Sequence, residues 1–503
     1  MRTRRPLASL LWCGALIAAG GLASVARVEG QDRQWPAERP PALLTPRPVN
    51  FPEYEIRTLA NGLQVVVVPH HEQPAVSIRM LVRAGAAYDP PGKTGLARLM
   101  ASLLDQGTNS RTAAQIADTI DYIGGALGTG VATDLAFVSA LVMNDSLGLG
   151  LELVSDVTRS PAFEPAELDR QRQQALSSMR VSYEDPEYIA NVVFDRLVYG
   201  FHPYGMPISG TPESVALITR EDIRAFHRRY FAPNNALLAI VGDVTSADAF
   251  AATERVFGDW ARQAVEVPQL PQPPAPTRRI VVVDKPDAVQ TEIRVGHLGV
   301  PRKHGEYLAL DLAVRILGGE GSNRLHRVLR TERGLTYGAQ ADMDTFQASG
   351  DIVAETDTRS EATGEVLRLI VEEFVKLQRD RPFPRELGDA QAYLTGSFPL
   401  TIETPDAIAT QVLNQLFYEL PLQELQTYRE RMNAVTVQDV ARVARLYLRP
   451  DRLSIVLVGN AAAFRDELQR AGFERYEVVP LDALDLFAAD FARPGSSRAG
   501  SRP

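Results

Sequence analysis

A stretch of sequence near the middle of the chain returns near its end. Residues 230–243 read YFAPNNALLAIVGD and residues 447–460 read YLRPDRLSIVLVGN. Each stretch has a proline-marked turn, an apolar run of the kind found in strands, and then a glycine. A second pair, RSPAF at 159–163 and DRPF at 380–383, stands ahead of a charged helical run at nearly the same offset. This repetition indicates a tandem duplication, so we expect two similar units.

Proline-rich stretches suggest where these units begin and end. Residues 27–52 and 265–278 are rich in proline, which lacks the amide donor of a strand ladder and favours extended chain. We therefore predict two linkers, with one domain at 53–264 and the other at 279–485. The end of the chain, 486–503, finishes in a run of Gly, Ser, Arg and Pro and is predicted to be a disordered tail.

Hydrophobic periodicity predicts strands, then helices, then strands in each unit. The expected strands are 63–68, 76–82, 134–142, 280–283 and 291–296, and the expected helices are 95–106, 113–123, 166–181, 306–317 and 361–377. This order is typical of an α+β protein, here with two tandem homologous α/β sandwich domains.

The amino terminus has the composition of a secretory signal peptide. Arg2, Arg4 and Arg5 precede an uncharged stretch, 6–26, in which Ser24 and Ala26 offer a cleavage site. We predict a signal peptide over 1–26 and an exported protein, periplasmic or secreted. The alternative is an uncleaved membrane anchor, which 6–26 is just long enough to form. The only cysteine, Cys13, lies in this segment, so the body of the chain has no disulfide, Cys ligand or Cys nucleophile.

Charge and motif content exclude several classes of function. The chain has 53 Lys and Arg against 62 Asp and Glu, a net charge of −9, which disfavours nucleic acid as the main partner. The run PPGKT at 90–94 ends like a phosphate loop, but Ala87 stands where the loop needs glycine. No two of the seven histidines are four residues apart, so no helix presents a His pair to one metal ion.

Three stretches near the start of the first predicted domain carry a family resemblance. NGL at 61–63, AGA at 84–86 and GLARLMASLLDQGT at 95–108 resemble the first domain of the pitrilysin/insulinase metallopeptidases, the inverzincins. The resemblance extends from about residue 51 to residue 479 and includes the turns at 185–186 and 202–205. It implies the mitochondrial-processing-peptidase-like metallohydrolase fold. In that family the helix after Gly-Leu-Ala carries His-x-x-Glu-His, whose histidines bind zinc and whose glutamate polarises water.

The resemblance assigns the metal positions to residues that cannot perform this chemistry. The His-x-x-Glu-His positions are Arg98, Ala101 and Ser102, and the third ligand, a family glutamate, falls at Ser177 or Ser178. Arginine stays protonated, alanine is no base, and serine is a poor neutral ligand. We therefore expect this chain to bind no zinc and to be inactive alone.

The second half resembles the family's C-terminal motif. That motif contains a glycine-rich loop, here Gly318, Gly319 and Gly321, followed by an arginine and a tyrosine, here Arg330 and Tyr337. The resemblance implies that the glycines let the backbone approach a peptide closely or let a loop flex. It also implies that Arg330 holds a substrate carbonyl and that Tyr337 donates to the oxyanion of the tetrahedral intermediate.

Two-chain members of this family pair a zinc-bearing subunit with a zinc-less one, and this chain resembles the zinc-less one. The resemblance implies a non-catalytic, substrate-binding subunit of a heterodimeric zinc metallopeptidase, with peptides as substrates and zinc in the partner. Two alternatives stay open. One is a non-proteolytic scaffold or peptide-binding protein of the same fold, and the other is a self-contained hydrolase whose metal ligands have moved.

Overall fold

In a computed structural model of the chain, residues 49–275, 277–319 and 323–494 are described. The signal peptide predicted over 1–26, most of the linker 27–52 and Gly321 of the predicted loop lie outside these ranges. Within the described ranges, no helix combines the length and the apolar character needed to cross a membrane.

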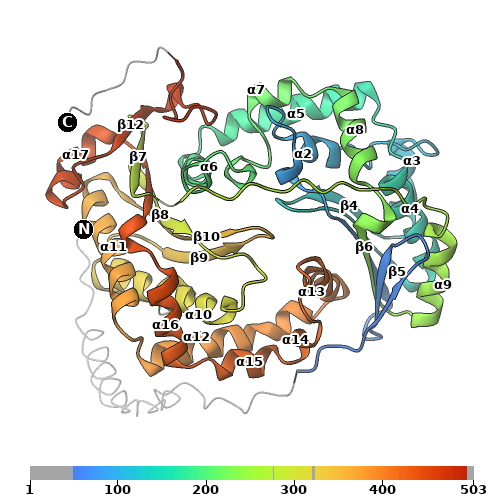
Figure 1. Cartoon of the computed structure of the whole chain (residues 1–503). Coiled ribbons are helices and arrows are strands. Elements are labelled where there is room, and N and C mark those ends of the chain that lie inside the picture. Colours follow the sequence, from blue (N-terminus) through green and yellow to red (C-terminus); the bar gives the residue numbers. More distant parts are fainter. Residues whose placement is uncertain (1–48, 276, 320–322, 495–503) are drawn as a thin grey trace, which may run out of the picture. The chain divides into compact units, whose positions relative to one another are not determined.

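The first half of the chain forms a six-stranded sheet in the order β1-β2-β6-β3-β5-β4. Figure 1 labels β4, β5 and β6 of this sheet. Its strands are β1 Glu55–Thr58, β2 Gln64–Pro69, β3 Ala75–Val82, β4 Ala126–Val131, β5 Ala136–Met143 and β6 Ala236–Gly242. Its helices are α2 Leu96–Ala101, α3 Ala113–Tyr122, α4 Leu147–Arg159, α5 Pro165–Ser182, α6 Pro186–Tyr199, α7 Pro212–Ala216, α8 Arg220–Tyr230 and α9 Ser246–Phe257.

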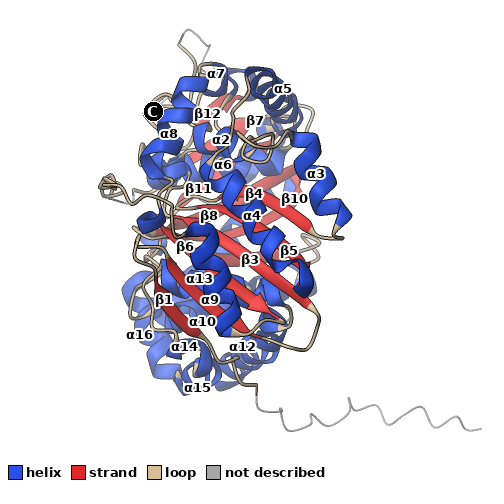
Figure 2. Ribbon diagram, turned by 90° about the vertical axis from the view of Figure 1, so that its right-hand side faces the viewer, coloured by secondary structure: helices blue, strands red, loops and turns tan. Residues whose placement is uncertain are grey.

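The second half forms a second six-stranded sheet in the order β12-β7-β11-β8-β10-β9 (Figure 2). Its strands are β7 Arg279–Asp284, β8 Gln290–Leu298, β9 Ala339–Thr345, β10 Gly350–Arg359, β11 Ser454–Gly459 and β12 Glu477–Pro480. Its helices are α10 Tyr307–Gly318, α11 Thr363–Arg379, α12 Pro384–Ser397, α13 Pro405–Phe417, α14 Gln423–Gln426, α15 Tyr428–Ala434, α16 Val437–Tyr447 and α17 Ala461–Arg470.

The two sheets repeat one topology, which confirms the predicted α+β duplication. The repeated stretches 230–243 and 447–460 each hold the end of a helix, a proline turn and a central strand, β6 or β11. The helices that precede them, α8 and α16, both begin with a Thr-x-x-Asp capping box, at Thr219 and Thr436. The halves differ at one edge: β1 is antiparallel to β2, whereas β12 is parallel to β7.

Each sheet is covered on one face by a helix from the other half. In the first sheet, Val65, Val67, Ile78 and Met80 pack in one core with α4 and α9, while Val66, Val68, Leu81 and Leu237 pack in another core with α13. In the second sheet, Ile280, Val282, Ile293 and Ile455 pack with α10, α11 and α16, while Val281, Val283, Val456 and Val458 pack with α6. The strands read as continuous apolar runs because both of their faces are buried.

This exchange of helices joins the halves firmly. From α13, Ile408, Val412, Leu413 and Phe417 are fully buried against β3 and β6. Burying one such side chain contributes about 1.5–3 kcal/mol, so the four contribute on the order of 10 kcal/mol. Neither half can therefore be expected to keep its structure without the other.

The predicted tail starts later than expected. We predicted disorder from residue 486, but Leu486 and Phe491 are buried, and Leu484 forms a bridge with Ala492. The backbone carbonyl of Leu486 accepts a hydrogen bond of 2.8 Å from Arg196 Nε of α6. The apolar side chains of 484–491 supply the burial that a disordered segment lacks. Residues 495–503 lie outside the described ranges.

Candidate functional site

Helix α2, which carries Arg98, is short and held at both ends. Gly95 before it has φ +92°, and the Asp89 carboxylate accepts hydrogen bonds from the backbone amides of Gly95 (2.7 Å) and Ala97 (2.8 Å). Burial raises the pKa of Asp89 to about 7, although these amide donors oppose the rise. After Ala101, Ser102 Oγ donates to the carbonyl of Leu99 (2.8 Å), in competition with further helix, so the helix is shorter than the predicted 95–106.

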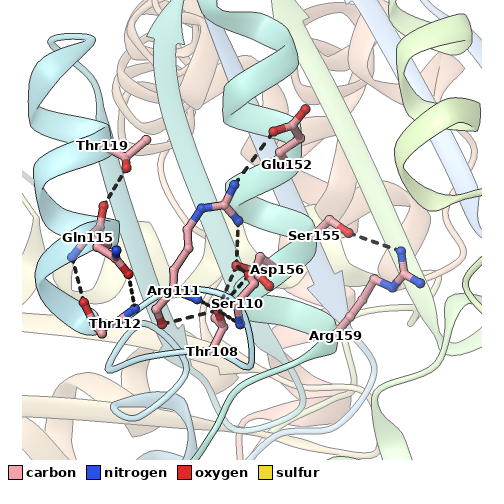
Figure 3. A network of polar contacts seen from close by, with 10 residues as sticks. All are labelled: Thr108, Ser110, Arg111, Thr112, Gln115, Thr119, Glu152, Ser155, Asp156 and Arg159. Carbon is pink, nitrogen blue, oxygen red and sulfur yellow. Dashed lines mark hydrogen bonds and ion pairs between the residues drawn. The ribbon is translucent and has the colours of Figure 1, made fainter.

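The end of α2 is hydrogen-bonded to the sheet, and hydrogen bonds also fix the loop that follows it. Thr129 Oγ1 of β4 donates to the carbonyl of Ala101 at 2.8 Å. In the loop that follows, Thr108, Ser110 and Arg111 all donate to Asp156 Oδ2 of α4, at 2.7–2.8 Å (Figure 3). The Gly-Thr that ends the 95–108 motif therefore has a structural role, because it fixes the chain after α2.

A cavity of about 270 Å³ opens between α2 and α5, and we name it the α2–α5 cavity. Its polar lining residues are Arg98, Ser102, Gln171, Gln174, Ser178, Ser182, Tyr188 and Ser209. The structure thus brings together three of the residues singled out from the sequence, Arg98, Ser102 and Ser178. Ala101 is fully buried and Ser177 is exposed, and neither is among the lining residues.

Arg98 also lines a second cavity, of about 470 Å³, which we name the Asp195 cavity. Asp195 and Tyr199 reach it from α6, and Asp344 and Asp351 reach it from the hairpin of β9 and β10. Tyr199 donates a hydrogen bond of 2.7 Å to the buried Asp351. Burial raises the pKa of Asp195 to about 7, and Asp344 adds repulsion while Arg294 opposes the rise.

These acidic residues were not predicted from the sequence. The available signal was Asp195, a charged residue inside the apolar run VVFDRLV of α6. Asp344 and Asp351 gave no comparable signal, because only the docking of the β9–β10 hairpin on the first half brings them to Asp195. That docking is visible in Tyr204, whose hydroxyl donates to Asp134 at 2.7 Å and accepts from the amide of Ala348 at 3.1 Å.

The predicted glycine loop borders a third cavity, of about 400 Å³, in the second half, which we name the Arg294 cavity. Gly318 and Gly319 line it together with Glu292, Arg294 and Glu355. A Cβ atom on Gly318 would lie 2.2 Å from the backbone nitrogen of Ala341, so glycine is needed there for the close approach of α10 to β9.

Arg330 and Tyr337 contact each other and are exposed to solvent. The guanidinium carbon of Arg330 lies 5.0 Å from the centre of the Tyr337 ring, and Arg330 Nη1 donates to the carbonyl of Thr336 at 3.3 Å. Tyr337 is 80 % exposed. Neither side chain is among those that line the three cavities. Their roles toward a substrate stay predictions.

Comparison with models of protein families shows which family this chain belongs to. Residues 64–211 match the family model "Insulinase (Peptidase family M16)", and residues 217–394 match the model "Peptidase M16 inactive domain". The chain belongs to the insulinase family, peptidase family M16. The family resemblance seen in the sequence is confirmed.

Relatives in the insulinase family match most of this chain. An uncharacterized zinc protease of Mycobacterium leprae is 27% identical over 396 residues, which is 78% of this chain and 88% of the relative. The zinc protease PqqE of Helicobacter pylori is 25% identical over 420 residues, 81% of this chain and 93% of the relative. The crystal structure of a peptidase M16 inactive domain from Pseudomonas fluorescens superposes with a TM-score of 0.77 at 28% identity, covering 81% of this chain and 98% of that one.

Zinc, which the insulinase-family resemblance implies, does not fit the α2–α5 cavity of this family member. Zinc in proteins is bound by Cys, His and carboxylate side chains. The lining residues offer a guanidinium, hydroxyls and amides instead. Across the residues that the structure describes, no three His, Cys, Asp or Glu side chains form a group that could hold a metal ion. The residue types that line this cavity therefore do not fit a zinc site.

Proposed function

We propose that this chain is the non-catalytic, substrate-binding subunit of an exported heterodimeric zinc metallopeptidase of the insulinase family. In this proposal a second family chain carries the intact His-x-x-Glu-His and the zinc ion. This chain binds no zinc, helps to bind the peptide, and contributes Arg330 and Tyr337 to the partner's site.

One observation supports the proposal: the α2–α5 cavity, where the family resemblance assigns the metal ligands, is lined by no His, Cys or carboxylate side chain among the described residues. Arg98, Ser102 and Ser178 line an open cavity. A protein without any use for this region would be free to fill it with apolar side chains. A retained cavity with altered chemistry supports a binding role, because concave sites with a few polar groups are where small ligands and peptides bind.

The exposure of Arg330 and Tyr337 supports their use toward a partner. No carboxylate of the described residues forms an ion pair with Arg330, and the Tyr337 hydroxyl has no hydrogen-bond partner among those residues. Their mutual contact keeps the two side chains together. Both are therefore available to a peptide held by a second subunit.

The proposal is tested by purifying the tagged chain gently from its native cell and identifying co-eluting proteins by mass spectrometry. We expect a family member with His-x-x-Glu-His at stoichiometric level, and about one zinc ion per complex. Recovery of the chain alone, or with unrelated envelope proteins, would remove the heterodimer. Zinc near one per chain in the isolated protein would instead support the hydrolase with relocated ligands.

The role of Tyr337 is tested in the same complex by Tyr337→Phe. Loss of one donor to an oxyanion lowers kcat by about a hundredfold or more, with little change in KM. Tyr122→Phe is the matched control, because Tyr122 is also exposed, at 91 %, and lies in α3 away from the motif.

A second candidate function is a non-proteolytic scaffold or peptide-binding protein of the same fold. The observation that favours it is that Arg330 and Tyr337 do not line the cavities described above. Unchanged turnover of the complex after Tyr337→Phe would select this function over the peptidase subunit.

A further inference from the structure

We propose that the α2–α5 cavity binds a carboxylate group of a peptide through the guanidinium of Arg98. This inference deepens the substrate-binding role proposed above by naming the chemistry of the ligand. The carboxylate comes either from the free carboxyl end of the peptide or from an Asp or Glu side chain.

The α2–α5 cavity carries a positive charge. Arg98 is the one charged side chain among the described residues that line it. It forms no ion pair or hydrogen bond through its side chain with any described residue. Its neighbours on α5 are paired: Arg170 with Glu167 (2.7 Å) and Arg172 with Asp169 (2.7 Å). An arginine stays protonated and binds carboxylates with a planar pair of donors, so this cavity carries an uncompensated positive charge.

Helix α5 adds neutral hydrogen-bond donors to the wall of the α2–α5 cavity. Gln171, Gln174 and Ser178 of α5 line the cavity, and their side chains form no hydrogen bonds with other described residues. Ser102, by contrast, already donates to the carbonyl of Leu99. A carboxylate has two oxygens that accept several hydrogen bonds, so Arg98 and these uncommitted groups complement it.

The acidic residues on the other side of Arg98 do not pair with it. Asp195, Asp344 and Asp351 share the Asp195 cavity with Arg98, but none of them forms an ion pair with it. Arg98 is also absent from the charges that shift the pKa values of these three groups. Arg98 is therefore not neutralised from within, and a ligand carboxylate can reach it from the α2–α5 cavity, where none of the described lining residues is acidic.

Strand β4, whose end lines a cavity together with Arg98, is an edge strand of the first sheet. β4 pairs with β5 alone among the described strands, so its outer edge presents unpaired backbone groups. Val131 at the end of β4 lines the Asp195 cavity together with Arg98, and Thr129 is bonded to the end of α2. An extended peptide that adds to this edge has its backbone held by β4 and a carboxylate within reach of Arg98.

The experiment uses the full-length chain alone, immobilised without partner or zinc. It is exposed to three mass-distinguished pools of N-acetylated heptapeptides. The first pool lacks Asp and Glu and ends in a free carboxyl group, the second is the same pool as C-terminal amides, and the third has amide ends and one Glu. We expect the first or the third pool to be retained about tenfold more than the second, because a charge-assisted hydrogen bond contributes that much.

Variants connect this preference to the cavity. In Arg98→Gln the preference disappears, and in Arg98→Lys, which keeps the charge without the planar pair of donors, part of it remains. Arg180→Gln is the matched control, since Arg180 is an exposed arginine of α5 that is not among the lining residues. We expect it to behave like the original chain.

Three results would overturn the inference: equal retention of all pools, no retention of any pool, or a preference that survives Arg98→Gln in a folded variant. Whether the first or the third pool is retained identifies the source of the carboxylate. Because neither a partner nor zinc is involved, this outcome is independent of whether the heterodimer exists.

Discussion

Each half of the chain has an arginine on the wall of a cavity, and the two arginines differ in burial and in ion-pair partners. In the second half, Arg294 is buried, with its guanidinium 3.2 Å from Glu292, 3.3 Å from Glu355 and 2.7 Å from Asn191. In the first half, Arg98 is exposed and unpaired among the described residues. The two halves of this chain therefore differ: Arg294 is a paired, buried arginine, whereas Arg98 is exposed and free to meet a ligand.

The difference is one of desolvation. A buried charge without a partner costs several kcal/mol, so Arg294 is stable only with its two carboxylates. Burial even raises the pKa of Glu292 in spite of the nearby Arg294. Arg98 remains in contact with water and needs no internal partner. An incoming carboxylate can thus bind Arg98 without displacing an existing ion pair.

The largest expected effect is that of Arg294→Met. It leaves Glu292 and Glu355 without their cation, so we expect the free energy of unfolding to fall by about 3 kcal/mol. Denaturant unfolding measures this, and Arg294→Lys, which keeps the charge, should lose less. A loss no greater than that of Arg98→Gln would abolish the distinction between the two arginines.

A paired charge in the first half gives the next largest effect. Asp156 accepts hydrogen bonds from Thr108, Ser110 and Arg111 (Figure 3), so Asp156→Ala should cost about 2 kcal/mol of unfolding free energy. The control is Glu152→Ala, because exposed Glu152 lies 3.9 Å from Arg111 and should contribute less than about 0.5 kcal/mol. Equal effects would show that the loop after α2 is not fixed by Asp156.

The raised pKa of Asp195 predicts that the stability of the chain depends on pH. The folded-state pKa of Asp195, about 7, lies above its unfolded value, so the folded chain holds a proton that the unfolded chain releases above about pH 4. Stability is therefore lost as the pH rises from about 4 to 7. Asp195→Asn should stabilise the chain at pH 8 and change its stability little at pH 4, as measured by unfolding at both values. A gain of the same size at pH 4 would contradict this reasoning.

The smallest effect on stability is expected for Arg98→Gln. Because Arg98 has no internal partner among the described residues, its removal should change the free energy of unfolding by less than about 0.5 kcal/mol. The same denaturant measurement applies. A loss of more than about 2 kcal/mol would mean that Arg98 is as structural as Arg294, and the proposed ligand site would lose its main support.

Much of the fold could be read from the sequence because the signals are local. The proline turns and apolar runs at 230–243 and 447–460 predicted the duplication, and expected strands such as 76–82 and 291–296 match β3 and β8 within a few residues. The helix expected at 166–181 matches α5. The helix expected at 95–106 was too long, since hydroxyl groups of Ser102 and Thr129 occupy carbonyls at the end of α2.

The sequence by itself determined that two like units follow each other and that Arg98, Ala101 and Ser102 are not the residue types with which proteins usually bind zinc, because repetition and side-chain chemistry need no coordinates. Only the tertiary structure decided that α6 and α13 each cover the other half's sheet. It also decided that Ser178 lines the α2–α5 cavity, which Ser177 does not, and that Arg98 has no ion-pair partner among the described residues although Asp195, Asp344 and Asp351 line a cavity with it. These features depend on which distant segments pack together, and packing partners are set by the whole core.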